Sequence, residues 1–380
     1  MSTPHDSTLG EETAAGAQQL DERYFVASSW TLMRRKFLRH RLALIGGVVL
    51  TVVYLMAVFA DFLAVSGRDR RYPEHLYAPP TRVRLVHEDG LRAPFVYGLQ
   101  VTRDPVTRAK VFTIDRGRTY PVRFLVTGYE YRLFGLITTR LHLLGVDEGA
   151  VLFPFGTDSL GRDMLTRVLH GARVSLSIGL VGVALSFLLG CLLGGISGFF
   201  GGAVDMLVQR IIEFLQALPT IPLWMALAAA VPIEWPALRV YFMITVILSV
   251  IGWTGLARVV RGKLLQLRTE DYVTAAAIGG STPMTIILRH LLPGFLSYLI
   301  VHLTLAIPYM ILGETALSFI GIGLRPPVVS WGVMLQQAQN VRTISLHPWL
   351  LIPGLFVVIV VLCFNFVGDG LRDAADPYRR

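Results

Sequence analysis

Residues 270–294, EDYVTAAAIGGSTPMTIILRHLLPG, form a short and mostly polar segment between two strongly apolar ones. Small residues at 274–277 precede a Gly-Gly pair at 279–280, and an Arg-His pair at 289–290 leads into Leu-Leu-Pro-Gly. Because alanine favours helix and a glycine pair ends one, the segment predicts a short helix, a corner, and a second helix that enters a membrane. An exposed helix of small residues suits docking into a cleft of another protein.

The composition indicates a membrane protein. The 380 residues are 53% hydrophobic and 16% charged, with a mean hydropathy of +0.56, whereas soluble domains carry about 25% charged residues. Lys and Arg outnumber Asp and Glu by 35 to 26. Basic flanks of membrane spans explain this excess, so no nucleic-acid partner is expected.

Apolar runs along the chain predict about six transmembrane helices, since about 20 apolar residues cross a hydrocarbon layer of about 30 Å. The basic cluster at 34–41 precedes the first run and is expected to remain in the cytoplasm. Both termini and the 270–294 segment then also lie inside. The expected fold class is an α-helical polytopic membrane protein with spans at about 42–64, 174–200, 206–230, 238–256, 295–320 and 349–367.

The long segment between the first two spans carries the strand signal. Alternating runs at 95–101 and 110–114 flank an Arg103-Asp104-Pro105 turn, and 122–127 is expected to form a third strand. We expect a small β-rich, extracytoplasmic insert. It is either a lid over the outer helix ends or a landing surface for a substrate-delivering protein.

Signatures of catalysis and metal binding are missing from the sequence, which has no HExxH, CxxC or GxSxG pattern. The nearest approach to a phosphate-binding loop, 255–263, has the wrong glycine spacing, and Lys263 is followed by Leu264. Cys191 and Cys363 fall within apolar spans and are expected to be packing residues. We therefore expect no catalytic residue, no metal ligand and no bound cofactor in this chain.

Two polar motifs flank the core spans. In GTDSLGRD, residues 156–163, either Asp158 or Ser159 is expected to cap a helix whose interior includes 164–169, as an elbow at the membrane surface or, alternatively, a substrate contact. Glu314 lies towards the outer end of the fifth span, where it either lines a pathway or bonds to another helix. His302 is a second candidate for the pathway.

Glycines recur every four residues in the second span and predict a stripe along one helix face. Such small-residue stripes let helix backbones approach closely in lipid, so we expect packing rather than chemistry. The four residues are Gly190, Gly194, Gly198 and Gly202.

These motifs resemble those of ABC importer permeases. The 274–293 segment is similar to their cytoplasmic coupling motif, Glu-Ala-Ala, three residues, Gly, nine residues, Ile-x-Leu-Pro, with Thr274 in place of Glu and His290 in place of Ile. The GTDSLGRD run and the ETALSFIGIG run at 314–323 resemble signatures of the dipeptide and oligopeptide branch, in its C-type permeases.

The resemblance implies the type I importer permease fold in a bacterial inner membrane, and it implies partners. These are a second, homologous permease subunit in a heterodimer, two ABC ATPases that bind ATP and Mg²⁺, and an extracytoplasmic binding protein. The coupling residues it implies are Asp271, Tyr272, Thr274, Ala275, Ala276, Gly279 and Gly280. The substrate would be a di- or oligopeptide or, alternatively, an oligosaccharide, an opine or nickel.

The resulting domain layout has five parts. They are a cytoplasmic tail with a basic interfacial helix (1–41), the first transmembrane helix (42–64), the β-rich insert with the elbow (65–167), a core of five spans with the coupling loop at about 265–285 (168–372), and a cytoplasmic C-terminal tail (373–380). The rival from another class is a secondary transporter that works alone, which should show an internal repeat or a cluster of midplane charges.

Overall fold

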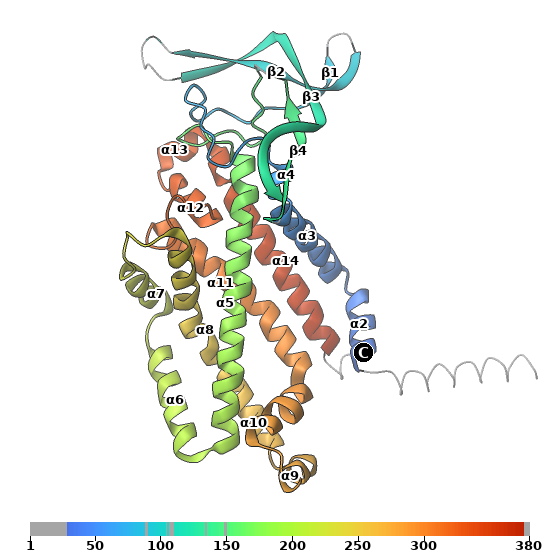
Figure 1. Cartoon of the computed structure of the whole chain (residues 1–380), viewed down its shortest axis with the longest axis vertical. Coiled ribbons are helices and arrows are strands. Elements are labelled where there is room, and N and C mark those ends of the chain that lie inside the picture. Colours follow the sequence, from blue (N-terminus) through green and yellow to red (C-terminus); the bar gives the residue numbers. More distant parts are fainter. Residues whose placement is uncertain are drawn as a thin grey trace, which may run out of the picture.

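A computed structural model describes residues 29–87, 90–103, 105, 110–133, 135–147 and 150–375. A body of long helices carries a β-sheet at one end, and the short helix α9 (Asp271–Ile278) lies at the opposite end (Figure 1). Residues 1–28 and 376–380 of the expected tails at 1–41 and 373–380, and Asp104 of the expected turn, lie outside the described residues. The expected helical membrane fold with a small β insert is confirmed.

Five helical segments are long and apolar enough to cross a membrane: Arg41–Val58, Met164–Phe200, Ala237–Leu267, Pro283–Ile320 and Pro348–Ala375. They contain α3 (Arg41–Val58), α5 (Met164–Phe200), α8 (Ala237–Leu267), α11 (Leu296–Ile320) and α14 (Ile352–Ala375). Shorter helices connect them: α2 (Ser29–Arg39), α4 (Ala60–Leu63), α10 (Pro283–Thr285), η1 (Ile286–Leu291), η2 (Leu292–Phe295), α12 (Trp331–Leu335), η3 (Gln336–Ala338), α13 (Val341–Leu346) and η4 (Pro348–Leu351).

The span expected at 206–230 is not one straight helix. It consists of α6 (Gly202–Ala217) and α7 (Thr220–Ala229), which are bent by 89°. The break has a local cause, because the residue before a proline is pushed out of the helical region. Leu218, which precedes Pro219, is extended with ψ of 135°. Within the described residues, the number of candidate spans is therefore five, or six if the bent pair is one broken span.

The insert is an antiparallel sheet in the order β1-β2-β3-β4. The strand expected at 122–127 is instead the second half of β3, which pairs first with β2 and then with β4. A bulge opposite Tyr97 and Gly98 accommodates residues 116–118, so the strands expected at 110–114 and 122–127 are one continuous strand. The strands are β1 (Arg84–His87), β2 (Gly90–Arg103), β3 (Lys110–Leu133) and β4 (Ile137–Val146).

Asp61 of α4 joins the insert to the helical body. Its carboxylate lies 2.7 Å from Arg173 Nη1 and 3.0 Å from His170 Nε2, both on α5. Burial alone would raise the pKa of Asp61, but the hydrogen bonds from His170 and Arg173 outweigh it and lower the pKa to about 2. On the sheet side, His142 Nδ1 and Tyr129 Oη lie 3.0 and 3.4 Å from the Asp61 carbonyl oxygen.

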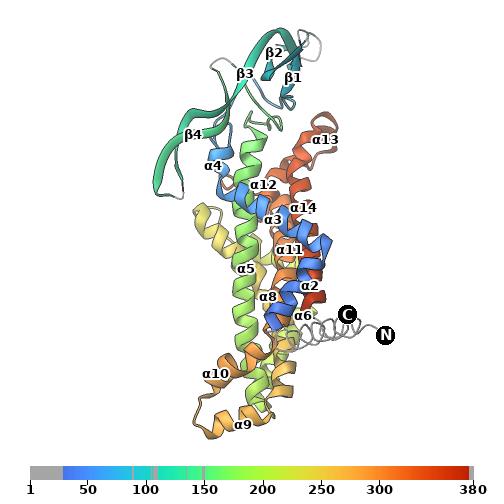
Figure 2. The same cartoon turned by 90° about the vertical axis from the view of Figure 1, so that its right-hand side faces the viewer.

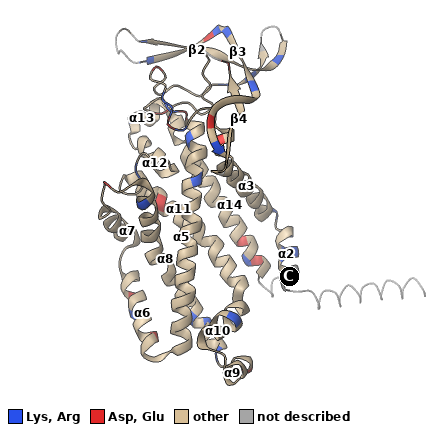
Figure 3. Cartoon of the chain, viewed as in Figure 1, with Lys and Arg blue, Asp and Glu red and all other residues tan. Residues whose placement is uncertain are grey.

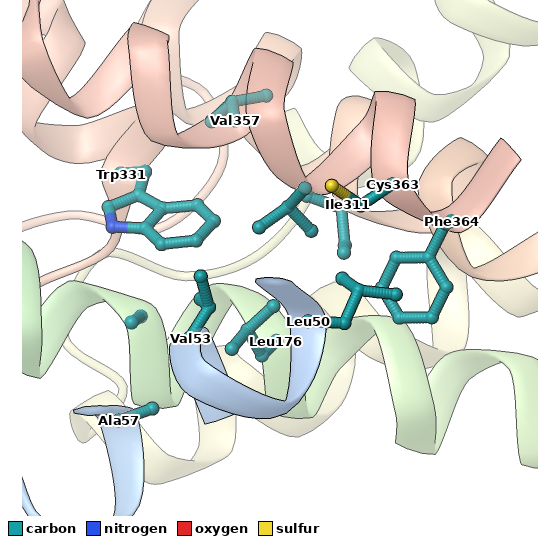
Figure 4. Close-up of a cluster of buried hydrophobic side chains, with 11 residues drawn as sticks. Leu50, Val53, Ala57, Leu176, Ile311, Trp331, Val357, Cys363 and Phe364 are labelled. Atoms are coloured by element: carbon teal, nitrogen blue, oxygen red, sulfur yellow. The ribbon is translucent and has the colours of Figure 1, made fainter. Parts of the chain in front are cut away.

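Apolar packing holds the first span to the rest of the body. Side chains of α3, α5, α11, α12 and α14 meet in one buried cluster that includes Leu50, Leu176, Ile311 and Trp331 (Figure 4). Charged residues gather on the sheet and around its junction with the helices, beside α7 and α11, near α10, and on α2 and the end of α14 (Figure 3). This distribution fits a body whose middle crosses a bilayer.

Candidate functional site

The expected corner after residue 278 is a Schellman motif. The backbone N–H of Ser281 donates to the carbonyl of Ala276 at 3.1 Å, and that of Gly280 donates to Ala277 at 3.1 Å. Gly279 is the C-cap residue, and Gly280 has a φ of +83°, which glycine adopts without strain. The two glycines therefore end α9 at a defined residue.

One side of α9 packs on the helical body. Val273 is only 4% exposed and belongs to a cluster that includes Leu256 and Leu264 of α8 and Ile286. Ala276, three residues further on, is partly buried against the same cluster. This side of α9 therefore packs on η1 and belongs to the same apolar cluster as the end of α8.

The side chains on the opposite side of α9 are exposed. Asp271, Thr274, Ala275 and Ile278 are exposed and share one helix face, because their spacing is i, i+3, i+4 and i+7. We call these four residues the α9 face; Tyr272 lies beside it and is 45% exposed. Ile278 is 83% exposed and is absent from the residues expected to couple. The sequence did carry a signal for Ile278 as a docking residue: it is a large apolar residue at the end of a helix of small residues, just before Gly279-Gly280.

A cavity of 640 Å³ lies between α5, α8 and α11. His302 of α11 lies in its wall, as do Tyr309 of the same helix and Gln216 of α6, while Glu314 does not. The wall is mostly apolar, and none of the described residues that line it is Asp, Glu, Lys or Arg. Leu256 belongs both to this wall and to the cluster that holds Val273. The cavity and α9 are thus connected through one packed cluster.

An ion pair between Arg261 and Asp205 joins α8 to α6 at the end of the body that carries α9. Arg261 Nη2 of α8 lies 2.5 Å from Asp205 Oδ2 of α6, and Ser197 Oγ of α5 donates to Asp205 Oδ1 at 2.5 Å. Three helices therefore share one carboxylate at this end of the body. Displacement of α8 then moves α5 and α6 with it.

Glu314 is fully buried on α11. Its carboxyl oxygens accept hydrogen bonds from the hydroxyl groups of Ser175 on α5 at 3.2 Å, Ser318 at 2.8 Å and Ser330 at 2.7 Å. The same hydroxyls accept, in turn, from the backbone N–H groups of Trp331, Leu324 and Val333. In this conformation Glu314 connects α5, α11 and the start of α12.

Replacing Glu314 with leucine is expected to lower the stability of the chain by about 2 kcal/mol, because three buried hydrogen bonds, two of them to other helices, are lost at about 0.6 kcal/mol each. Glu314→Gln, which keeps an acceptor at Ser318 and Ser330, should lose less than half of that. Thermal unfolding in detergent measures both. Unchanged melting together with lost transport in the leucine variant would instead assign Glu314 to the pathway.

Three of the four stripe glycines lie where α5 meets α8. A Cβ added at Gly190 would meet the side chain of Leu256, and one at Gly194 or Gly198 would meet the backbone of Ala257 or Arg261. Gly202 does not belong to this stripe. Since α5 ends at Phe200, Gly202 begins α6 with a φ of +57° and has no atom within 4 Å of its Cβ position.

The helix after the GTDSLGRD motif is capped by neither Asp158 nor Ser159. Asp163 caps it, accepting from the backbone N–H of Thr166 at 2.8 Å. The Asp158 carboxylate instead forms an ion pair with Arg162, whose Nε donates to it at 2.7 Å. The helix begins at Met164 and continues without a break into the span, so the elbow is the first turn of α5.

No group of three His, Cys, Asp or Glu side chains among the described residues is arranged to hold a metal ion. The thiols of Cys191 and Cys363 are buried in different apolar clusters and form no disulfide.

Comparisons with known proteins place the chain among transport permeases. Residues 188–380 match the family model of the binding-protein-dependent transport system inner membrane component, and residues 28–80 match the N-terminal TM domain of oligopeptide transport permease C. The oligopeptide transport system permease protein OppC of Haemophilus influenzae is 40% identical over 227 residues, which are 60% of this chain and 70% of that protein. The dipeptide transport system permease protein DppC of Bacillus subtilis is also 40% identical, over 60% of this chain and 69% of that protein. Among solved structures, the inward-facing MetNI methionine ABC transporter has a TM-score of 0.42 at 22% identity and covers 56% of this chain and 97% of that chain.

Proposed function

This chain belongs to the family of binding-protein-dependent transport system inner membrane components, and from that premise we propose that it is the C-type permease subunit of an ATP-driven peptide importer. It forms half of the translocation pathway. Curated relatives at 40% identity are named for oligopeptide and dipeptide transport, which supports peptides as the cargo.

The observation that carries this proposal is the packed connection between α9 and the cavity. The α9 face offers Asp271, Thr274, Ala275 and Ile278 for docking, while Val273 on its other side contacts the cluster that contains Leu256. Leu256 is also part of the cavity wall. A protein that binds α9 and moves it also moves a wall of the cavity. When two ATPases close on nucleotide, they move α9 in this way and so open and close the pathway.

The partners follow from this arrangement. Two ATPase subunits bind at the α9 end, and a binding protein delivers substrate at the end that carries the sheet. A second, homologous permease subunit completes the pathway as a heterodimer. The α9 end and both termini lie in the cytoplasm, because the basic residues at 34–41 precede α3 and stay inside. The chain itself is not an enzyme, since ATP is hydrolysed by the partner ATPases.

The cavity wall also fits a peptide of variable sequence. A wall without charged side chains selects for no particular charge on the cargo, while His302, Gln216 and Tyr309 can donate or accept hydrogen bonds. Selection among peptides then belongs to the binding protein. An oligosaccharide, an opine or a nickel complex is the alternative cargo of the same importer class.

Reconstitution into proteoliposomes tests the proposal. The chain, with its second permease subunit, two ATPases and binding protein, should accumulate a radiolabelled tripeptide only when ATP is present. Leaving out either the ATPases or the binding protein should abolish uptake.

Uptake by the chain alone, driven by an ion gradient, would contradict the proposal and favour a secondary transporter. ATP-dependent uptake of nickel, an oligosaccharide or an opine, but not of peptides, would retain the importer and reject the peptide cargo.

A further inference from the structure

A second cavity, of 530 Å³, lies away from the one assigned to transport. It is bounded by α3, α5 and the hairpin that joins β3 to β4. Tyr54 of α3 and Leu176 and Leu180 of α5 form apolar walls, and Arg132 and Gly135 of the hairpin close it from the side. It shares no lining residue with the transport cavity.

The hairpin reaches down to the level of the membrane spans. Tyr54 and Leu180 are residues of two of the membrane-crossing helices, and Gly135 at the hairpin turn lines the same cavity. In Figure 2 the β3–β4 hairpin descends beside α4 on the outside of the body. Next to Gly135, Leu136 and Ile137 are 86% and 61% exposed. An exposed apolar turn at this level is suited to the acyl region of a bilayer.

The charges at the cavity leave one cation without a counter-ion. Arg173 is already neutralised, because its Nη1 lies 2.7 Å from Asp61 Oδ2 and its Nε and Nη2 donate to carbonyl oxygens of Ala57 and Val58. Arg132 is exposed, and within the described part of the chain its guanidinium group forms no hydrogen bond or ion pair. The charged lining residues Asp61, Arg132 and Arg173 together carry a net charge of +1. This positive charge lies on Arg132, next to the apolar walls of the cavity.

We propose that this cavity binds one anionic glycerophospholipid of the surrounding leaflet. The Arg132 guanidinium receives the phosphate, in the bidentate manner that arginine favours with phosphate oxygens. One acyl chain lies along Tyr54, Leu176 and Leu180, under the hairpin turn. The lipid thereby fills the gap between the insert and the first two spans and holds the insert in place.

A lipid fits this cavity better than the other occupants. A transported peptide would need a path to the cavity assigned to transport, with which this one shares no lining residue. A neighbouring protein chain would have to fill an apolar space flanked by two membrane spans and a cation at its rim. A phospholipid supplies both an apolar chain and an anion, and it is present wherever the spans are.

Photo-crosslinking in nanodiscs tests the proposal on the chain purified with its accompanying subunits. The nanodiscs contain equal parts of phosphatidylglycerol and phosphatidylcholine, and one or the other carries a photoactivatable acyl chain. Phosphatidylglycerol should crosslink to residues of α3, α5 and the hairpin about fivefold more than phosphatidylcholine does, since one arginine near an anionic lipid contributes about 1 kcal/mol. Arg132→Gln should remove that preference, and Leu180→Trp, which fills the cavity, should reduce crosslinking of both lipids.

Arg103→Gln is the matched control, because Arg103 is an exposed arginine at the far end of β2 in the same insert. It should crosslink as the unmodified chain does. Equal labelling by the two lipids, a loss in Arg103→Gln as large as in Arg132→Gln, or crosslinks from this cavity to another protein subunit would each overturn the proposal. Because lipid labelling is the readout, the result is independent of transport and of the identity of the cargo.

Discussion

Replacing Ile278 with aspartate is expected to weaken binding of the ATPase subunits about thirtyfold or more and to abolish transport. Ile278 is 83% exposed at the end of the α9 face and is the large apolar side chain among its four residues. A central apolar anchor of a protein interface contributes about 2 kcal/mol or more, which is roughly thirtyfold in affinity. A carboxylate at this position would also have to be desolvated on docking.

The fold should not change in this variant, because Ile278 makes no contribution to the buried core. Copurification of the ATPases with the tagged permease, and titration of their binding in detergent, measure the effect. Ile233→Asp is the control, since Ile233 is 77% exposed in the connection between α7 and α8 and is not part of α9. If Ile278→Asp binds the ATPases as strongly as the control does, α9 is not the docking helix.

Replacing Gly194 with alanine is expected to destabilise the helical body by about 3 kcal/mol. The added Cβ would lie 2.8 Å from the Cα atom of Ala257, and it would also overlap the carbonyl group of that residue. Backbone atoms of α8 cannot rotate away as a side chain can, so the two helices must separate. Overpacking of this kind costs about 1–3 kcal/mol, and contact with backbone places this site at the upper end.

Gly262→Ala is the matched control on the facing helix. Gly262 lies within α8, and a Cβ there would meet no atom within 4 Å. This substitution should leave stability unchanged or raise it by up to about 1 kcal/mol, through the better helix propensity of alanine. Unfolding of both variants by titration with a denaturing detergent gives the comparison. Equal stability of Gly194→Ala and Gly262→Ala would show that α5 and α8 do not pack through the glycine stripe.

Local patterns in the sequence were enough for the elements that depend on near neighbours. The apolar runs predicted where the body crosses a membrane, and the small residues before Gly279-Gly280 predicted α9 and its end. The family resemblance, carried by 274–293 and two further motifs, predicted the permease class that the comparisons support. These features depend on hydrophobic length, helix propensity and capping, each of which acts within a few residues.

The same local patterns failed where strand pairing, a competing side chain or the end of a helix overrode them. The strands expected at 110–114 and 122–127 are one strand, because pairing with β2 accommodates residues 116–118 as a bulge. Asp158 looked like a helix cap, but Arg162 takes up its carboxylate and Asp163 caps the helix instead. Gly202 continued the spacing of the stripe, although the helix had already ended at Phe200.

The sequence by itself thus determined that this protein is a helical membrane protein with a short helix that ends at Gly279-Gly280, because the free energy of membrane insertion and of helix ends is set locally. Only the tertiary structure decided which residues work together. It buried Glu314 among serines from three segments, placed His302 in a cavity wall, and linked that wall to Val273 through Leu256. Apart from Ser318, which follows Glu314 by one turn of α11, those neighbours are far apart along the chain, and helix packing brings them into contact.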